Sequence, residues 1–254
     1  MLFGPKDLET VTVTDLTPAG KLLRQPSPDH PLFYAAISGG YHDLGGLKGG
    51  EKPIARQSVD QTMIKILAKQ GYLPVAPGQR PDVILAWKWG TLNIYIFQDG
   101  SGLTFRRANE GQLLRFLGGD KHGLISRYGD PFPEQTLAPG LFPISGDAQT
   151  LIDTSKEDLY VAVISAYAVT LRDAKHAELL WNTRISAPAR GFWLPEALPA
   201  MLAIATPYVG RETTKPVWIR ATDKFKPDIH LGDLRMVEYL EKTPATVVVA
   251  GPSS

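Results

Sequence analysis

The chain has 254 residues, of which 43% are hydrophobic and 21% charged, a composition typical of a globular protein and not of a disordered chain. With 27 basic and 26 acidic residues and no long basic run, the sequence argues against nucleic acid as a partner. The absence of cysteine excludes disulfides and thiolate chemistry, and no apolar run is long enough to predict a transmembrane helix.

The first 97 residues predict strands around one helix. Alternating side chains and gathered β-branched or aromatic residues indicate strands at three places: residues 10–16, 32–38 and 82–89. The apolar stripe within residues 55–70 predicts an amphipathic helix, and Gly71 follows as its terminator. Gly90 is expected to break or bulge the third strand before residues 92–97.

Residues 98–158 are the least regular part of the sequence. Two short helices are predicted here, one beginning near Asn109 and one within residues 145–159. The rest reads as loop, so this stretch is expected to be an irregular insertion within a single domain that spans residues 1–254. Such an insertion can be a lid, a functional surface or a tolerated loop.

The clearest architecture is a strand, turn, strand and helix between Tyr160 and Gly210. A short turn centred on residues 174 and 175 would place Ala168 opposite Trp181 and Ile164 opposite Ile185. One face of this pair then sets small side chains against large ones, which predicts a buried face beneath the following helix at residues 195–208.

The opposite face of the same two strands is mixed in character. It carries polar side chains among small and β-branched ones: Val163, Ser165, Tyr167, Val169, Asn182, Arg184 and Ser186. An antiparallel sheet can leave such a face in water. We therefore take Tyr167, Asn182 and Arg184 as the candidate binding residues.

The sequence after Gly210 predicts three further short strands, at residues 217–219, 235–240 and 245–250. With the elements above, the predicted fold is α/β of the layered α+β type. It has a mostly antiparallel sheet, two main helices packed on one face, and the insertion at residues 98–158.

No motif identifies a catalytic centre. The five histidines lack the spacing of a metal site, so no metal and no cofactor are predicted, and no serine lies in a nucleophile elbow. His42, Asp43, Asp120 and His122 lie in glycine-rich segments that read as loops, where catalytic groups are often held. These four are the candidates for an acid/base site, although the sequence favours a protein that is not an enzyme.

Two segments carry a resemblance to a known group of proteins. They are ILAKQGYLPVAPGQRPDVILAWKWG and YVAVISAYAVTLRDAKHAELLWNTRIS. Together they resemble uncharacterised bacterial cell-envelope lipoproteins that carry a domain of unknown function. The resemblance implies export to the periplasm or outer membrane and a lipid anchor at the amino terminus, but no residue roles. The sequence as written has neither a signal peptide nor the cysteine that bears the lipid, so a cytoplasmic location is the alternative.

The leading hypothesis is a non-enzymatic envelope protein that binds a ligand or a partner protein. One alternative is a hydrolase whose acid/base site is built from the loop candidates, and another is a structural subunit of an assembly. The sequence leaves the ligand, the partner and the oligomeric state open, and any membrane contact is expected through the lipid anchor.

Overall fold

The computed structural model describes residues 8–44, 54–92, 96–98, 104–106, 110–125, 145–169 and 177–221. The strands are β1 (Glu9–Leu16), β2 (Leu32–Leu44), β3 (Tyr72–Pro74), β4 (Val83–Leu92), β5 (Ile96–Gln98), β6 (Thr104–Arg106), β7 (Leu159–Ala168), β8 (Leu179–Pro188) and β9 (Val217–Arg220). The α-helices are α1 (Pro18–Leu22), α2 (Arg56–Lys69), α3 (Glu110–Phe116), α5 (Gly146–Thr154) and α6 (Leu194–Ala205). The 3₁₀ helices are η2 (Gly119–His122) and η4 (Thr206–Tyr208).

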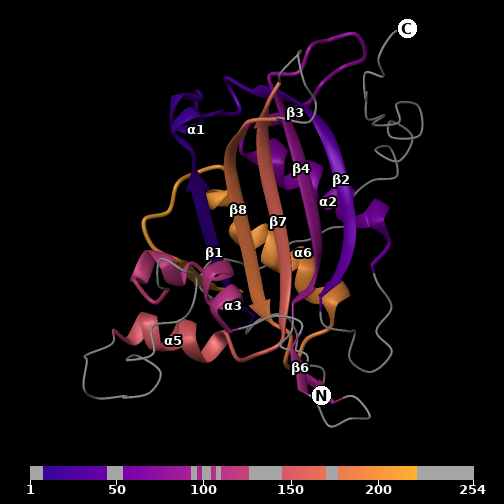
Figure 1. Ribbon diagram of the computed structural model, residues 1–254. Coiled ribbons are helices and arrows are strands. Elements are labelled where there is room, and N and C mark those ends of the chain that lie inside the picture. Colours follow the sequence, from indigo (N-terminus) through magenta and orange to yellow (C-terminus); the bar gives the residue numbers. More distant parts are fainter. Residues whose placement is uncertain are drawn as a thin grey trace, which may run out of the picture.

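Seven strands form one mixed sheet in the order β3-β2-β4-β7-β8-β1-β9 (Figure 1). Strand β2 runs parallel to β3 and β4, whereas every other neighbouring pair in this sheet is antiparallel. Strands β5 and β6 form a separate hairpin. The predicted fold class, an α+β protein with a mostly antiparallel sheet, is confirmed.

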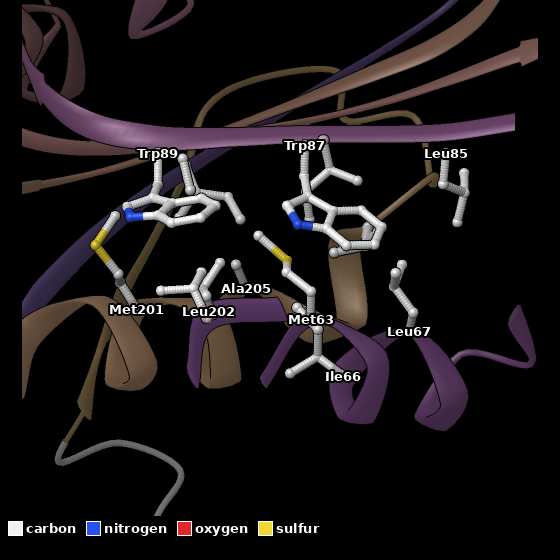
Figure 2. Packing of buried hydrophobic residues seen from close by; sticks show 14 of the residues in the cluster. Met63, Ile66, Leu67, Leu85, Trp87, Trp89, Met201, Leu202 and Ala205 are labelled. Atoms are coloured by element: carbon white, nitrogen blue, oxygen red, sulfur yellow. The ribbon is translucent and has the colours of Figure 1, made fainter. Parts of the chain in front are cut away.

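Helices α2 and α6 cover one face of the sheet, which we call the helix-covered face. Leu85, Trp87 and Trp89 of β4 point from the sheet towards the two helices (Figure 2). Met63 of α2 lies below Trp87, and Met201 of α6 lies near Trp89. These side chains are all at most 3% exposed. The predicted pair of helices on one face is therefore present.

The other face of the sheet is covered at one corner. Helices α3, η2 and α5 lie over the ends of β1, β7 and β8 (Figure 1). Leucines of α3 and α5 pack there on valines of β1 and β7 and form a second apolar cluster: Leu113, Leu114, Leu151, Val11, Val13 and Val161. The segment expected to be an irregular insertion thus supplies part of the packed structure.

Two boundaries in the first half differ from the sequence prediction. Strand β2 continues to Leu44, so His42 and Asp43 lie in a strand and not in a glycine-rich loop. Strand β4 runs through Gly90 to Leu92 without a break. A bulge between Ser38 and Gly40 lets β2 stay paired with β4 along this length. Pairing between strands overrides the local preference of glycine for a turn.

The β7–β8 pairing has the predicted faces but a different register. Ala166 lies opposite Trp181 and Ala162 opposite Ile185, so the predicted partner of Trp181, Ala168, was wrong by two residues. A bulge on the β8 side, between Leu179 and Trp181, lies opposite Ala166 and Tyr167. Because side chains alternate with a period of two, an even shift leaves Trp181, Asn182, Arg184 and Ile185 on their predicted faces. Leu179 is the exception, because the bulge moves it from the predicted buried face to the face of Tyr167.

Near its termini the chain follows the prediction in part. Strand β9 pairs with β1 at one edge of the sheet, as expected of residues 217–219. The strands predicted at residues 235–240 and 245–250 lie outside the described residues.

The first prediction concerns the close approach of β2 and β4. A Cβ added at Gly90 would lie 1.7 Å from the backbone oxygen of His42. We expect Gly90→Ala to force the two strands apart and to lower the free energy of unfolding by about 2–4 kcal/mol. Urea denaturation of both proteins measures this loss.

Gly146→Ala is the matched control. A Cβ at Gly146, the first residue of α5, meets no described atom within 4 Å. This change should alter the unfolding free energy by less than about 0.5 kcal/mol. Equal stability of the two variants would show that β2 and β4 do not pack this closely.

Two buried tyrosines make stability sensitive to alkaline pH. Burial raises the pKa of Tyr34 above its ordinary value. Burial also raises the pKa of Tyr72, more than the neighbouring Trp181 indole and the charge of Arg211 lower it. Each hydroxyl therefore stays protonated in the folded chain at a pH where it ionises in the unfolded chain.

We expect the free energy of unfolding to fall as pH rises above about 10, because the unfolded chain then binds fewer protons than the folded one. Each tyrosine contributes a slope of about 1.4 kcal/mol per pH unit. Tyr34→Phe should halve the contribution of the two tyrosines to this slope. It should not lower the stability at neutral pH, because the Tyr34 hydroxyl is buried without a described hydrogen-bond partner. Urea midpoints measured from pH 8 to pH 11 test this, and equal slopes would contradict it.

Candidate functional site

The candidate site is the part of the second sheet face that α3, η2 and α5 leave uncovered, which we call the open face. It is formed by side chains of four adjacent strands: Ala35, Ile37, Ile84, Ala86, Lys88, Val163, Ser165, Tyr167, Leu179 and Asn182. In Figure 1 no described helix lies over this part of β2, β4, β7 and β8. The open face is thus a broad sheet surface and not a cleft between loops.

Strand register arranges these side chains in rows across the sheet. One row runs from Ile37 through Ala86 and Ser165 to Asn182. The neighbouring row contains Ala35, Ile84, Tyr167 and Leu179. Ile37 is 42% exposed, while its neighbours in both rows are half-buried. The surface is apolar towards β2 and becomes polar towards β8.

The polar end of the open face is held by a hydrogen bond between strands. The Ser165 hydroxyl donates to the side-chain oxygen of Asn182 over 3.0 Å. Tyr167 lies half-buried in the next row. Two of the three predicted binding residues, Tyr167 and Asn182, therefore share one surface, as the alternation of the strands indicated.

Arg184 has a different environment. Its guanidinium donates to Asp15 over 2.6 Å and to the backbone oxygen of Arg115 in α3. Lys121 of η2 donates to the other Asp15 oxygen over 2.8 Å. Arg184 and Lys121 are mostly buried, and together with Asp15 they fasten α3 and η2 to β1 and β8. Arg184 thus lies at the border of the open face with its charge already paired.

The four candidates for an acid/base site are divided between two regions. His42 lies exposed on β2, where Asp43 pairs with Thr91 of β4. Asp120 and His122 lie in η2, whose Lys121 contacts β1. Strands β2 and β1 are four positions apart in the sheet, about 19 Å at the usual strand spacing. The structure does not bring the two histidines together.

Metal binding finds no geometric support within the described ranges. They contain no group of three histidine, aspartate or glutamate side chains arranged to hold an ion. They also contain no helix long and apolar enough to cross a membrane.

Sequence reasoning missed the apolar half of the site. Ile37 and Ile84 belong to strands that were predicted, and their alternation with buried residues carries the signal. The missing information was which face of β2 and β4 the helices α2 and α6 would cover. That choice depends on contacts between segments that are distant in sequence.

Comparison with known proteins does not place the chain in a family. No family model and no curated protein match it. A PelC L103M dodecamer from Paraburkholderia phytofirmans is 9% identical with a TM-score of 0.34, covering 80% of this chain and 99% of the other. A DUF4136 family protein from Bacteroides thetaiotaomicron is 10% identical with a TM-score of 0.33, covering 81% and 98%.

A PDZ domain protein from Parabacteroides distasonis is 11% identical with a TM-score of 0.37, covering 84% of this chain and 39% of that protein. These neighbours are bacterial proteins, and one is from a family of unknown function, the kind that the sequence resemblance names. At such scores none of them assigns a role to this chain.

The third prediction tests the ion-pair cluster beside the open face. Arg184→Met removes the hydrogen bond to α3 and leaves Asp15 with one cation. We expect the free energy of unfolding to fall by about 2–3 kcal/mol, because the pair is largely desolvated on the arginine side. Urea denaturation measures the loss.

Arg220→Met is the control for the loss of a surface charge. Arg220 is 65% exposed and pairs with Glu9 over 3.4 Å. Its removal should cost less than about 1 kcal/mol. If both variants lose the same small amount, Arg184 does not fasten α3 to the sheet.

Proposed function

We propose that this chain is a non-enzymatic protein of the bacterial cell envelope that binds a partner protein through the open face. The observation that carries the proposal is the apolar surface formed by Ala35, Ile37, Ile84 and Ala86 beside Tyr167. A sheet face that serves only as a wet surface normally carries polar side chains in alternation. A contiguous apolar area on a folded chain more often marks an interaction site.

The shape of the surface favours a protein over a small ligand. The open face extends over β2, β4, β7 and β8, so its outer strands are about 14 Å apart. Sites for small molecules are concave and enclose most of the ligand. Protein interfaces instead combine an apolar centre with a polar rim. Here Lys88, Ser165 and Asn182 supply polar groups next to the apolar rows.

Tyr167 is the residue best suited to anchor a partner. Its ring lies in the apolar row with Ile84, and its partner across the strand pair is Leu179. Tyrosine combines a large apolar ring with a hydroxyl that can bond across an interface, and it is enriched among residues that dominate binding energy.

A hydrolase receives less support from the geometry. General acid/base catalysis needs groups that reach one reacting atom together. His42 and His122 belong to regions separated by four strand positions. The envelope location rests on the sequence resemblance alone, and it predicts a signal sequence followed by a lipid-bearing cysteine in the gene upstream of Met1.

The fourth prediction locates the partner by photo-cross-linking. A photoreactive phenylalanine at position 37, in the full chain expressed in its native bacterium, should give an adduct with a second protein. The control is the same photoreactive phenylalanine in place of Gln57, which is exposed in α2 on the other side of the sheet. The control should give no adduct. Gel mobility and mass spectrometry of the adducts measure the result.

A variant that introduces a charge into the open face makes the test specific. Ile37→Asp should abolish cross-linking from a probe at Lys88 without loss of stability, because Ile37 is already 42% exposed. The proposal is wrong if no adduct forms at Ile37 or Lys88, or if Gln57 gives the same adduct.

A further inference from the structure

A second exposed feature lies at the end of the sheet, away from the open face. The large hydrophobic side chains exposed in the described part of the chain are Leu22, Ile37 and Trp193. Trp193 is 67% exposed, whereas the tryptophans of the helix-covered face are buried. Tryptophan is costly to leave in water, so the reason for its exposure has to be found in its surroundings.

Trp193 belongs to the short connection between β8 and α6. The N–H of Phe192 donates to the oxygen of Ala189 over 3.3 Å, which closes a tight turn. Gly191 at the third position of this turn has φ of 84°, a conformation that favours glycine. Arg190 is exposed on the same turn, and Phe192 is half-buried. We call residues 190–193 the aromatic tip.

The aromatic tip is held in place from both sides. The buried Tyr160 donates its hydroxyl to the oxygen of Phe192 over 3.0 Å. The oxygen of Trp193 accepts the N–H groups of Glu196 and Ala197 over 3.0 and 2.8 Å, which begins α6. The backbone of Trp193 is thus fixed while its indole points away from the core. The hydrogen bonds of the fold therefore hold Trp193 in an exposed position.

We infer that the aromatic tip contacts a lipid surface, with the Trp193 indole at the level of the headgroups. Tryptophan prefers this depth because its ring is apolar and its N–H can bond, and arginine extends its charge to the same interface. A standard protein interface takes about 800 Å² from each partner. The aromatic tip is a single turn, and Pro195 and Glu196 that follow it are exposed. A narrow tip suits insertion between headgroups better than a flat interface.

The charges on the tip indicate what should drive this contact. Arg190 of the tip and Glu196, three residues after it, are both exposed and carry opposite charges. Anionic lipid should therefore add little, and insertion of the ring should dominate. One indole buries less apolar surface than a single acyl chain, which itself gives only marginal membrane binding. The aromatic tip is then an auxiliary contact that orients a chain already held at the membrane.

The fifth prediction uses tryptophan fluorescence of the full chain. Vesicles of phosphatidylcholine, with and without phosphatidylglycerol, are prepared with a nickel-chelating lipid that tethers a histidine-tagged chain. Tethering should shift the emission to the blue, and Trp193 should lose most of its accessibility to iodide. Brominated phosphatidylcholine should quench the same emission. Trp193→Ala should lose all three effects, while both vesicle types should behave alike.

Leu22→Ala is the matched control. Leu22 is 88% exposed in α1, which packs at the start of β8, about 30 Å from the end of that strand where the aromatic tip begins. Its removal should change none of the three effects. Without tethering, only a small fraction of the chain should co-sediment with the vesicles. Trp193→Phe should lower this fraction less than Trp193→Ala.

Three outcomes would overturn the inference. Trp193 could stay accessible to iodide on tethered vesicles, or the brominated lipid could quench Trp193→Ala equally. Trp193 could also be protected in solution because copies of the chain associate through the tip, which would assign it to a protein interface. The inference rests on the envelope location proposed above, but none of these outcomes bears on the cross-links from the open face, so the lipid contact and the partner binding fail separately.

Discussion

The structure depends on the packing of α2 and α6 against the strands that carry tryptophan. Trp87 and Trp89 alternate along β4 and both point towards the helices (Figure 2). Each fully buried side chain of this size stabilises the fold by roughly 2–3 kcal/mol. Alanines at positions 162 and 166 of β7 leave room for the large rings beside them. Trp87 also donates its indole N–H to Asp60 over 2.7 Å, which fixes α2 along the strand.

This packing decides what the second face of the sheet can do. With α2 and α6 on one side, the sheet has a complete core there, and the chain needs only a partial layer on the other side. Among the described residues that layer consists of α3, η2 and α5, fastened at its border by Asp15, Lys121 and Arg184. The open face is the part of the second sheet face that this layer leaves uncovered. Its existence follows from the asymmetry of the two layers, and its apolar rows follow from β2 and β4.

The sequence was sufficient wherever the signal was local. The stripe of α2, the alternation of β7 and β8, and the match of small with large side chains predicted those elements and their buried faces. It was insufficient where long-range contacts decide. The glycine-rich segment after Ser38 reads as a loop and Gly90 as a break, yet β2 and β4 pair through Gly40 and Gly90. At Gly90 only a residue without Cβ fits beside the His42 oxygen. The candidate site was half predicted for the same reason: Tyr167 and Asn182 share a face by alternation, while Ile37 and Ile84 join them only through pairing with β4.

The positions of the two proposed surfaces relate them to each other. The aromatic tip follows the end of β8, so a membrane that meets Trp193 lies beyond one end of the strands (Figure 1). The open face runs along the strands and therefore stands across the membrane plane instead of facing it. A chain oriented by Trp193 would present Ile37 and Tyr167 sideways, towards a protein on the same membrane. Lipid contact and partner binding then use different directions of one rigid sheet, and neither blocks the other.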